Sequence, residues 1–202
     1  MTKIKFCGFT RDEDVRTAVA LGVDAIGLNL ARGPRKITVA RAAELARLIP
    51  PFITTVALFV DDDEVTIMAA MRATRCTAVQ LHGNEPPELA ERLRTRFTVL
   101  KAFAVKDAST LSRVRGYPAD AYLLDAAVPG QAGGTGTAWD HHLLAGVQFD
   151  RPVVLAGGLK PGTVAAAIAA TAPYAVDVAS GIESAPGIKD PAAMAAFIAA
   201  CR

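Results

Sequence analysis

The chain has almost no excess of charge and no apolar run long enough to cross a membrane. Its 202 residues include 22 lysines and arginines against 20 aspartates and glutamates, a formal net charge of +2. Such a balance does not favour nucleic acid or an anionic lipid surface as the main partner. A membrane-spanning helix needs about 20 consecutive apolar residues, and no segment has them. We therefore expect a protein that binds neither nucleic acid nor membrane.

Cysteine and histidine are scarce. The three cysteines, Cys7, Cys76 and Cys201, form neither a paired framework nor a Cys-x-x-Cys motif, which favours a reducing, cytoplasmic setting. The first residues run into an apolar segment without a signal-peptide core, which agrees with that setting. Three histidines without a carboxylate cluster predict no metal site. We expect neither a metal nor a cofactor.

Short apolar runs alternate along the chain with amphipathic or alanine-rich stretches. Most of the runs are continuously apolar, which is typical of parallel strands buried on both faces. Helix start signals stand between them: Thr10 with Glu13 predicts a capping box, and Thr38, the acidic run 61–64 and Asp190 precede later helices. The predicted strands are Ile4–Cys7, Ala25–Leu30, Thr54–Phe59, Ala78–Leu81, Val99–Phe103, Ala121–Leu124, Val153–Ala156 and Ala175–Val178.

This repeat fits two α/β folds, an open doubly wound sheet and a closed (β/α)₈ barrel. The count of eight strands and the even spacing of roughly 25 residues favour the barrel. No Gly-x-Gly-x-x-Gly motif follows the first strand, where a dinucleotide site would place it. No linker interrupts the pattern. We therefore predict one (β/α)₈ TIM-barrel domain spanning residues 1–202.

Glycine-rich turns follow the last two predicted strands. Gly157 and Gly158 come after the seventh strand, and Ser180 and Gly181 come after the eighth. Glycine lets backbone N–H groups approach an anion, and barrel phosphate sites are built from these two loops. The alternative is that both are only tight turns. Their occurrence together at these two strands favours a phosphorylated substrate.

Two groups suited to proton transfer are predicted at the same end of the barrel. Cys7 ends the first strand, and a thiol with an ordinary pKa of about 8.5 becomes a usable base near positive charge. Asp125 ends the sixth strand, and the glycine-rich stretch 126–137 after it predicts a mobile lid. The simpler alternatives are a small buried hydrophobe and a turn former. A thiol and a carboxyl across an anchored substrate suit acid–base catalysis.

Six motifs in order cover the chain from Lys3 to Ile198. They are Lys5-Phe6-Cys7-Gly8-Phe9-Thr10, Gln80-Leu81-His82-Gly83-Asn84-Glu85, Leu123-Leu124-Asp125, Gly133-Gly134-Thr135-Gly136, Ala156-Gly157-Gly158-Leu159 and Val176-Asp177-Val178-Ala179-Ser180-Gly181-Ile182-Glu183. With these motifs the chain resembles the phosphoribosylanthranilate isomerase family of tryptophan biosynthesis.

The resemblance implies an Amadori rearrangement by general acid–base catalysis. N-(5-phosphoribosyl)anthranilate, an aminoaldose, would become the aminoketose 1-(2-carboxyphenylamino)-1-deoxyribulose 5-phosphate. Asp125 would be the general acid that protonates the furanose ring oxygen and opens the ring to a Schiff base. Cys7 would be the general base that removes the proton from C2.

The resemblance also implies a set of binding residues. Arg35 would hold the anthranilate carboxylate, for which a planar guanidinium is well suited; Arg32 is the second candidate. The other substrate-binding residues would be Gln80, Gly134, Gly136 and Asp177, and those for the phosphate would be Gly157, Gly158, Ser180 and Gly181.

Two neighbours of the predicted acid and base need separate expectations. Lys5 lies two residues before Cys7 on the same strand face, about 6.7 Å away along the chain. We predict that it points into the barrel, pairs with Asp177 and biases Cys7 towards thiolate; the alternative is that it only supports the barrel. His82 is predicted to bond to the backbone at its turn.

Other functions remain open at this point. Indole-glycerol-phosphate synthase would need a catalytic lysine on an early strand, and a dual-substrate isomerase of histidine and tryptophan synthesis would have aspartate at Cys7. A metal-dependent pentose-phosphate epimerase would need paired histidines. A catalytically silent phosphate binder would need neither Cys7 nor Asp125. We expect a monomer or a homodimer.

Overall fold

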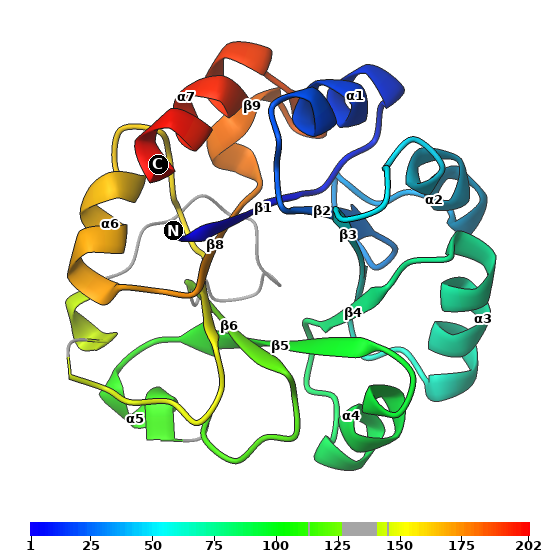
Figure 1. Ribbon diagram of the computed structural model, residues 1–202. Helices are drawn as coiled ribbons and strands as arrows, with labels where there is room; N and C mark the ends of the chain where they lie inside the picture. Colours follow the sequence, from blue (N-terminus) through cyan, green and yellow to red (C-terminus); the bar gives the residue numbers. More distant parts are fainter. Residues whose placement is uncertain (113, 127–140, 145) are drawn as a thin grey trace.

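The computed structural model describes residues 1–112, 114–126, 141–144 and 146–202. In these residues eight parallel strands pair in sequence order and close into a barrel, because the last strand pairs with the first (Figure 1). The predicted (β/α)₈ barrel is confirmed. The strands are β1 (Lys3–Cys7), β2 (Ala25–Asn29), β3 (Thr54–Phe59), β4 (Ala78–Leu81), β5 (Thr98–Val105), β6 (Ala121–Ala126), β7 (Val153–Leu155) and β8 (Ala175–Val178).

The helices form a ring around the outside of the barrel (Figure 1). They are α1 (Asp12–Ala20), α2 (Val39–Ala46), α3 (Glu64–Thr74), α4 (Pro87–Arg94), α5 (Ala108–Ser112), α6 (Val164–Thr171) and α7 (Pro191–Cys201), with the short 3₁₀ helices η1 (His141–Leu144) and η2 (Ser180–Ile182). Among the described residues, none of these helices has the length and apolar character that crossing a membrane requires.

Side chains along each strand alternate between the barrel interior and the layer beneath the helices. On β1, Ile4 and Phe6 belong to the outer core, whereas Lys5 and Cys7 point inward. Because both faces are buried, the strands read as continuous apolar runs in the sequence. The apolar interior consists of small and medium side chains: Val56, Ala78, Leu100, Ala102, Leu123, Val154, Ala156 and Ala175.

The predicted capping box at the first helix is wrong. The N-cap of α1 is Arg11, and it makes no side-chain cap. The Thr10 hydroxyl instead donates to the carbonyl oxygen of Gly187, 2.6 Å away and distant in sequence. A long-range bond has therefore replaced the local one. Three other predicted helix starts are confirmed by side-chain caps, those of Thr38, Asp63 and Asp190.

A short hairpin that was not predicted follows the eighth strand. After η2 the chain forms β9 (Glu183–Ala185) and β10 (Ile188–Lys189) before entering α7. The two strands are antiparallel, and their register places Lys189 opposite Glu183. The Pro-Gly dipeptide at 186–187 is the turn signal that could have predicted this hairpin.

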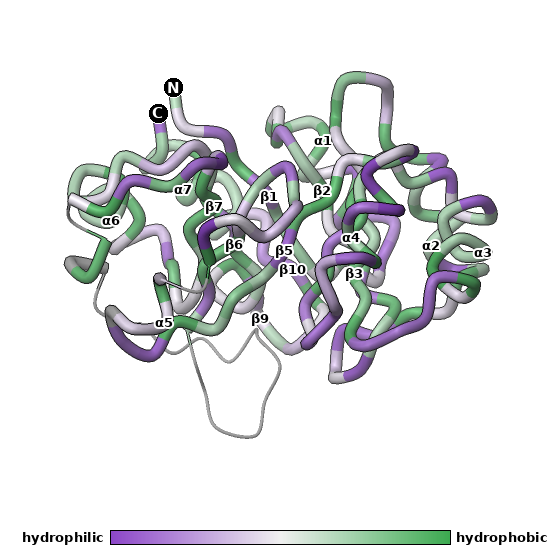
Figure 2. Tube along the Cα trace, turned by 90° about the horizontal axis from the view of Figure 1, so that it is seen from below, coloured by the Kyte–Doolittle hydropathy of each residue, from purple (hydrophilic) through white to green (hydrophobic). Residues whose placement is uncertain are grey.

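The two chain termini lie near each other at one end of the barrel (Figures 1 and 2). The backbone amide of Lys3 donates to the carbonyl oxygen of Tyr174, and the Arg202 guanidinium donates to the carbonyl oxygen of Gly22. These contacts lie where β1 and β8 begin. The carboxyl ends of the strands therefore lie at the opposite end.

The last helix is held on the barrel by aromatic packing. Phe197 in α7 is fully buried and meets Phe6 of β1 edge-to-face, with ring centroids 5.9 Å apart. We expect Phe197→Ala to lower the free energy of unfolding by about 3–5 kcal/mol, because it leaves a cavity against the strand. Urea unfolding measures this cost. The matched control is Val65→Ala on the exposed side of α3, for which a change within about 0.5 kcal/mol is expected; equal costs would contradict the packing described.

Candidate active site

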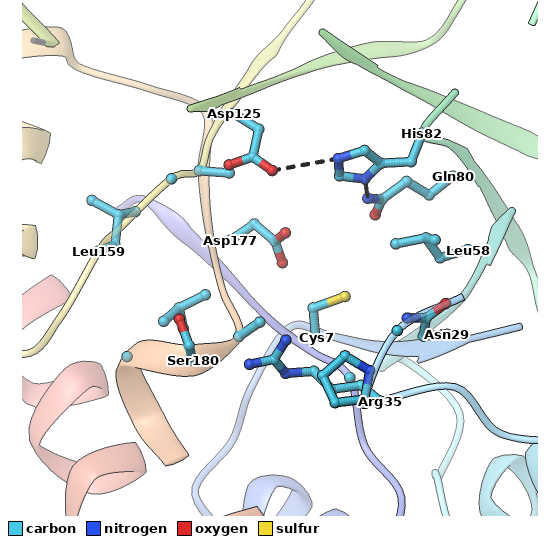
Figure 3. Close-up of a pocket in the computed structure, with 18 of the residues that line it drawn as sticks. Cys7, Asn29, Arg35, Leu58, Gln80, His82, Asp125, Leu159, Asp177 and Ser180 are labelled. Carbon is cyan, nitrogen blue, oxygen red and sulfur yellow. Dashed lines mark hydrogen bonds and ion pairs between the residues drawn. The ribbon is translucent and has the colours of Figure 1, made fainter. Parts of the chain in front are cut away.

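A cavity of about 490 Å³ opens at the carboxyl ends of the strands (Figure 3). That volume lies within the range of small-molecule sites. All the predicted site residues that the structure describes line it: Cys7, Arg35, Gln80, Asp125, Gly157, Gly158, Asp177, Ser180 and Gly181. The predicted Gly134 and Gly136, and most of the predicted lid 126–137, lie outside the described residues.

Cys7 reaches the cavity because it occupies an inward position at the end of β1. It pairs in register with Gly27 of β2, and a Cβ on that glycine would lie 2.7 Å from the Cys7 Sγ. No other residue type leaves room for the thiol at this orientation, since real Cβ atoms keep a longer distance. Gly27 therefore shapes the position of Cys7, although its sequence context gave no sign of this.

The predicted pairing of Lys5 with Asp177 is confirmed. The two residues are register partners on β1 and β8, and the Lys5 Nζ lies 2.8 Å from the Asp177 Oδ1 with both side chains nearly buried. Burial raises the pKa of the Cys7 thiol above its ordinary value, while the Lys5 ammonium acts in the opposite direction. The charge of Lys5 thus acts towards the thiolate, in the predicted direction, and burial acts against it.

Asp125 points into the cavity from β6, on a different side from Cys7 (Figure 3). Its Oδ1 accepts from the backbone amide of Ala126 at 2.8 Å, and its Oδ2 lies 3.4 Å from the His82 Nε2. The strands β7 and β8 separate Asp125 from Cys7 around the ring. A substrate in the cavity can therefore be contacted by both groups at once.

The expectation that His82 bonds to the backbone through its side chain is wrong. Its Nδ1 lies 2.8 Å from the Gln80 Nε2, and its Nε2 faces Asp125. When the Gln80 amide donates to Nδ1, the ring proton resides on Nε2 and points at the carboxylate. The missed signal was the spacing, because positions 80 and 82 share the inward face at the end of β4.

Gln80 carries one further feature. Its Oε1 is buried and, in the described part of the protein, has no hydrogen-bond partner. A buried carbonyl oxygen without a partner is costly and is expected to accept from a bound molecule or water. This agrees with the predicted role of Gln80 in binding substrate.

A second buried lysine, Lys101, holds the turn that carries His82. It points outward from β5, and its Nζ lies 2.7 Å from the Glu85 Oε2 and 2.6 Å from the carbonyl oxygen of Gly83. Glu85 in turn accepts from the backbone amides of Gly83 and Asp61. This ion pair fixes the β4 turn from the side of the helices and does not line the cavity.

Arg35 lies at the cavity with its guanidinium engaged by Glu183. The Nε and one terminal nitrogen donate to the two carboxylate oxygens at 2.8 and 2.7 Å. Although burial alone would raise it, Arg35 and Lys189 hold the pKa of Glu183 below its ordinary value. Arg32, the other candidate for a carboxylate anchor, is exposed at the rim of the cavity.

The two predicted glycine turns meet at one end of the cavity. Gly157 and Gly158 have φ angles of 89° and 67°, which favour glycine, and both line the wall. A Cβ on Gly181 would overlap the carbonyl oxygen of Leu159, so the turns after β7 and β8 are in close contact. The pair forms a wall of accessible backbone. No group of histidine, cysteine, aspartate or glutamate in the described residues could hold a metal ion.

A family model and a curated relative point to the same family. The family model described as N-(5'-phosphoribosyl)anthranilate isomerase matches residues 4–200. The N-(5'-phosphoribosyl)anthranilate isomerase of Desulforudis audaxviator is 45% identical over 204 residues, covering 100% of this chain and 98% of its own length.

Two solved structures extend the likeness to the fold. A phosphoribosyl anthranilate isomerase in complex with reduced 1-(o-carboxyphenylamino)-1-deoxyribulose 5-phosphate has a TM-score of 0.89 and 34% identity, over 98% of this chain and 97% of that one. A structure of monomers generated from the dimeric phosphoribosylanthranilate isomerase of Thermotoga maritima has a TM-score of 0.90 and 33% identity, over 99% and 98%.

The charges around Cys7 predict how its reactivity depends on pH. In wild type the rate of Cys7 alkylation by iodoacetamide should rise with pH to a midpoint above that of an ordinary thiol, about 8.5. Lys5→Met removes a neighbouring positive charge, so the midpoint should move up by about one unit. Mass spectrometry of the modified peptides measures it, with Cys201 in α7 as the internal reference. An unmoved Cys7 midpoint would show that Lys5 only supports the barrel.

The contact between Gly27 and Cys7 can be tested by a double-mutant cycle. We expect Gly27→Ala to lower the free energy of unfolding by about 1–3 kcal/mol through overpacking. The cost should shrink in a Cys7→Ala background, because the nearest atom is then absent. Gly162→Ala is the matched control, since nothing lies near its added methyl group. Urea unfolding reports all four variants, and an undiminished cost in the Cys7→Ala background would contradict the contact.

Proposed function

Because this chain belongs to the N-(5'-phosphoribosyl)anthranilate isomerase family, we propose that its barrel cavity performs the isomerisation with Cys7 as general base and Asp125 as general acid. The protein is an isomerase of tryptophan biosynthesis. One observation above all supports the assignment of roles: a thiol and a carboxyl enter one cavity from different strands, beside a wall of glycine backbone. Binding alone would need neither group.

The proposed substrate orientation follows from charge. The phosphate would lie at the turns after β7 and β8, where Gly157, Gly158 and Gly181 allow close approach of backbone N–H groups and Ser180 offers a hydroxyl. The anthranilate carboxylate would lie at Arg35, whose planar guanidinium suits it. The ribose carbons between these anchors would then face Cys7 and Asp125. Gln80 Oε1, which lacks a partner, would accept a donor from the substrate.

The first step would open the sugar ring. Asp125 gives its proton to the furanose ring oxygen while the bond between C1 and that oxygen breaks, and the anilino nitrogen supplies electrons to form a Schiff base. The His82 Nε2 contacts the Asp125 Oδ2, and the backbone amide of Ala126 donates to the Asp125 Oδ1. Both contacts stabilise the carboxylate that this step leaves behind.

The second step would use the thiolate. Cys7 removes the proton from C2, the electron pair moves into a C1–C2 double bond, and the Schiff base becomes an enolamine. Tautomerisation to the ketone restores the starting protonation states, since an isomerisation consumes no net proton. Burial disfavours the thiolate, and the Lys5 and Lys189 ammonium groups offset part of that penalty.

We propose the cytoplasm as the setting, and either a monomer or a homodimer as the state of the protein. Its partner would be the phosphorylated small-molecule substrate, with neither nucleic acid nor membrane involved and with no metal or cofactor required. The related Thermotoga maritima enzyme described as dimeric supports the homodimer among these.

The proposal predicts loss of the substrate's anthranilate fluorescence with wild-type protein. Cys7→Ser and Asp125→Asn should each lower kcat by roughly 100-fold to 10,000-fold, because each removes one proton-transfer group. Cys7→Asp should keep more activity than Cys7→Ser, since a carboxylate is also a base. Cys201→Ser, far from the cavity in α7, is the matched control and should behave as wild type. An inactive wild type that still binds inorganic phosphate would indicate a silent binder.

A further inference from the structure

Lys189 is a buried lysine that gives or takes no proton in the proposed catalytic steps. It ends the β9–β10 hairpin and its side chain is fully shielded from solvent. Its ammonium lies 5.4 Å from the centre of the Phe9 ring, and its backbone amide donates to Asp14 at 3.0 Å. Burying a lysine is costly unless all its donors are satisfied. The hydrogen-bond acceptors of the Lys189 ammonium therefore show which parts of the structure this side chain holds in position.

The three acceptors of the Lys189 ammonium come from both sides of the barrel closure. The Nζ lies 2.6 Å from the carbonyl oxygen of Cys7, 3.0 Å from that of Ala179, and 2.8 Å from the Glu183 Oε1. The first acceptor belongs to the proposed base itself. The second immediately precedes Ser180, in the turn proposed to hold phosphate. One ammonium thus bridges the end of β1 and the turn after β8.

Lys189 also takes part in a charged network that reaches Arg35. Glu183 accepts from Lys189 and, through both of its oxygens, from Arg35. Two cations share one carboxylate, so the network keeps one positive charge beside the cavity. The nearby Lys5–Asp177 pair is neutral as a whole. An anionic substrate would therefore meet a net positive charge at the end of β1 and β8.

We propose that Lys189 is a positioning residue of the isomerase, whose ammonium ties the strand end carrying Cys7 to the turn that binds the substrate's phosphate. This rests on the proposed function for the identity of the substrate. Through this contact the position of Cys7 depends on the turn after β8, and one buried ammonium positions both. A purely structural lysine would stabilise the barrel without affecting either.

The test compares two buried lysines of like environment. Lys189→Met should raise the KM for substrate and the inhibition constant of inorganic phosphate roughly tenfold, and lower kcat on the order of 100-fold, through loss of charge and misplacement of Cys7. Its Cys7 alkylation midpoint should move to higher pH. Besides Lys189, the charged groups near Cys7 are Lys5, Asp177 and Arg35, all retained.

Lys101→Met is the matched control. Lys101 is equally buried, pairs with a carboxylate at 2.7 Å and lies near aromatic rings, but it stands on β5 away from the cavity. Its loss should cost similar stability, while phosphate affinity and the alkylation profile of Cys7 stay as in wild type. Equal effects of the two variants on phosphate and alkylation would overturn the proposal, as would wild-type values in Lys189→Met.

A second comparison covers the case in which Lys189→Met does not fold. The double variant Lys189→Met/Glu183→Gln removes one cation and the carboxylate together, so the network of Lys189, Glu183 and Arg35 keeps its net charge. Compared with Glu183→Gln alone, it should show the same loss of phosphate affinity and the same upward move of the Cys7 midpoint. No difference between the two would overturn the proposal. Phosphate binding and alkylation need no turnover, so they decide this question even if wild type proves inactive on the substrate.

Discussion

The pairing of β8 with β1 is the constraint on which the rest of the structure depends. It closes the barrel, and it brings together residues from the two ends of the chain. Inside the closure, Lys5 and Asp177 are register partners; outside it, Lys189 contacts the carbonyl oxygens of Cys7 and Ala179. An open sheet would leave each of these cations without its acceptors. The position of the cavity therefore depends on the pairing of β8 with β1.

The fold was predictable from the sequence because the signals for individual strands and helices agree with the eight-fold repeat of the whole chain. Strands buried on both faces give continuous apolar runs, and α2, α3 and α7 begin at residues whose side chains cap them. The residues of the cavity were predictable for a related reason: strand parity and strand ends place Cys7, Asp125 and the glycine turns at one end. Lys5 and Asp177 followed from parity and adjacency of the first and last strands.

What could not be predicted depends on contacts between distant residues. The Thr10 hydroxyl donates to the carbonyl oxygen of Gly187 instead of capping α1, and no sequence pattern near Thr10 indicates this long-range hydrogen bond. Gly27 reads as an ordinary glycine in a strand until Cys7 is placed beside it. Lys189 has no motif around it, and its importance comes entirely from acceptors that belong to Cys7, Ala179 and Glu183. His82 differs from these residues. The sequence spacing shows that positions 80 and 82 lie on the same face of the strand, so the contact between His82 and Gln80 was predictable, but a contact with the turn backbone was expected instead.

The two chain termini lie near each other, at the end of the barrel where β1 and β8 begin, and this arrangement suits circular permutation. A short peptide from residue 202 to residue 1 would cross neither the cavity nor a strand, and a new break at an exposed turn such as that of Phe52 would open no barrel hydrogen bond. Such a circular permutant keeps every register pair of the ring. The site is thus a property of a closed cycle of strands, for which the point where synthesis starts is arbitrary.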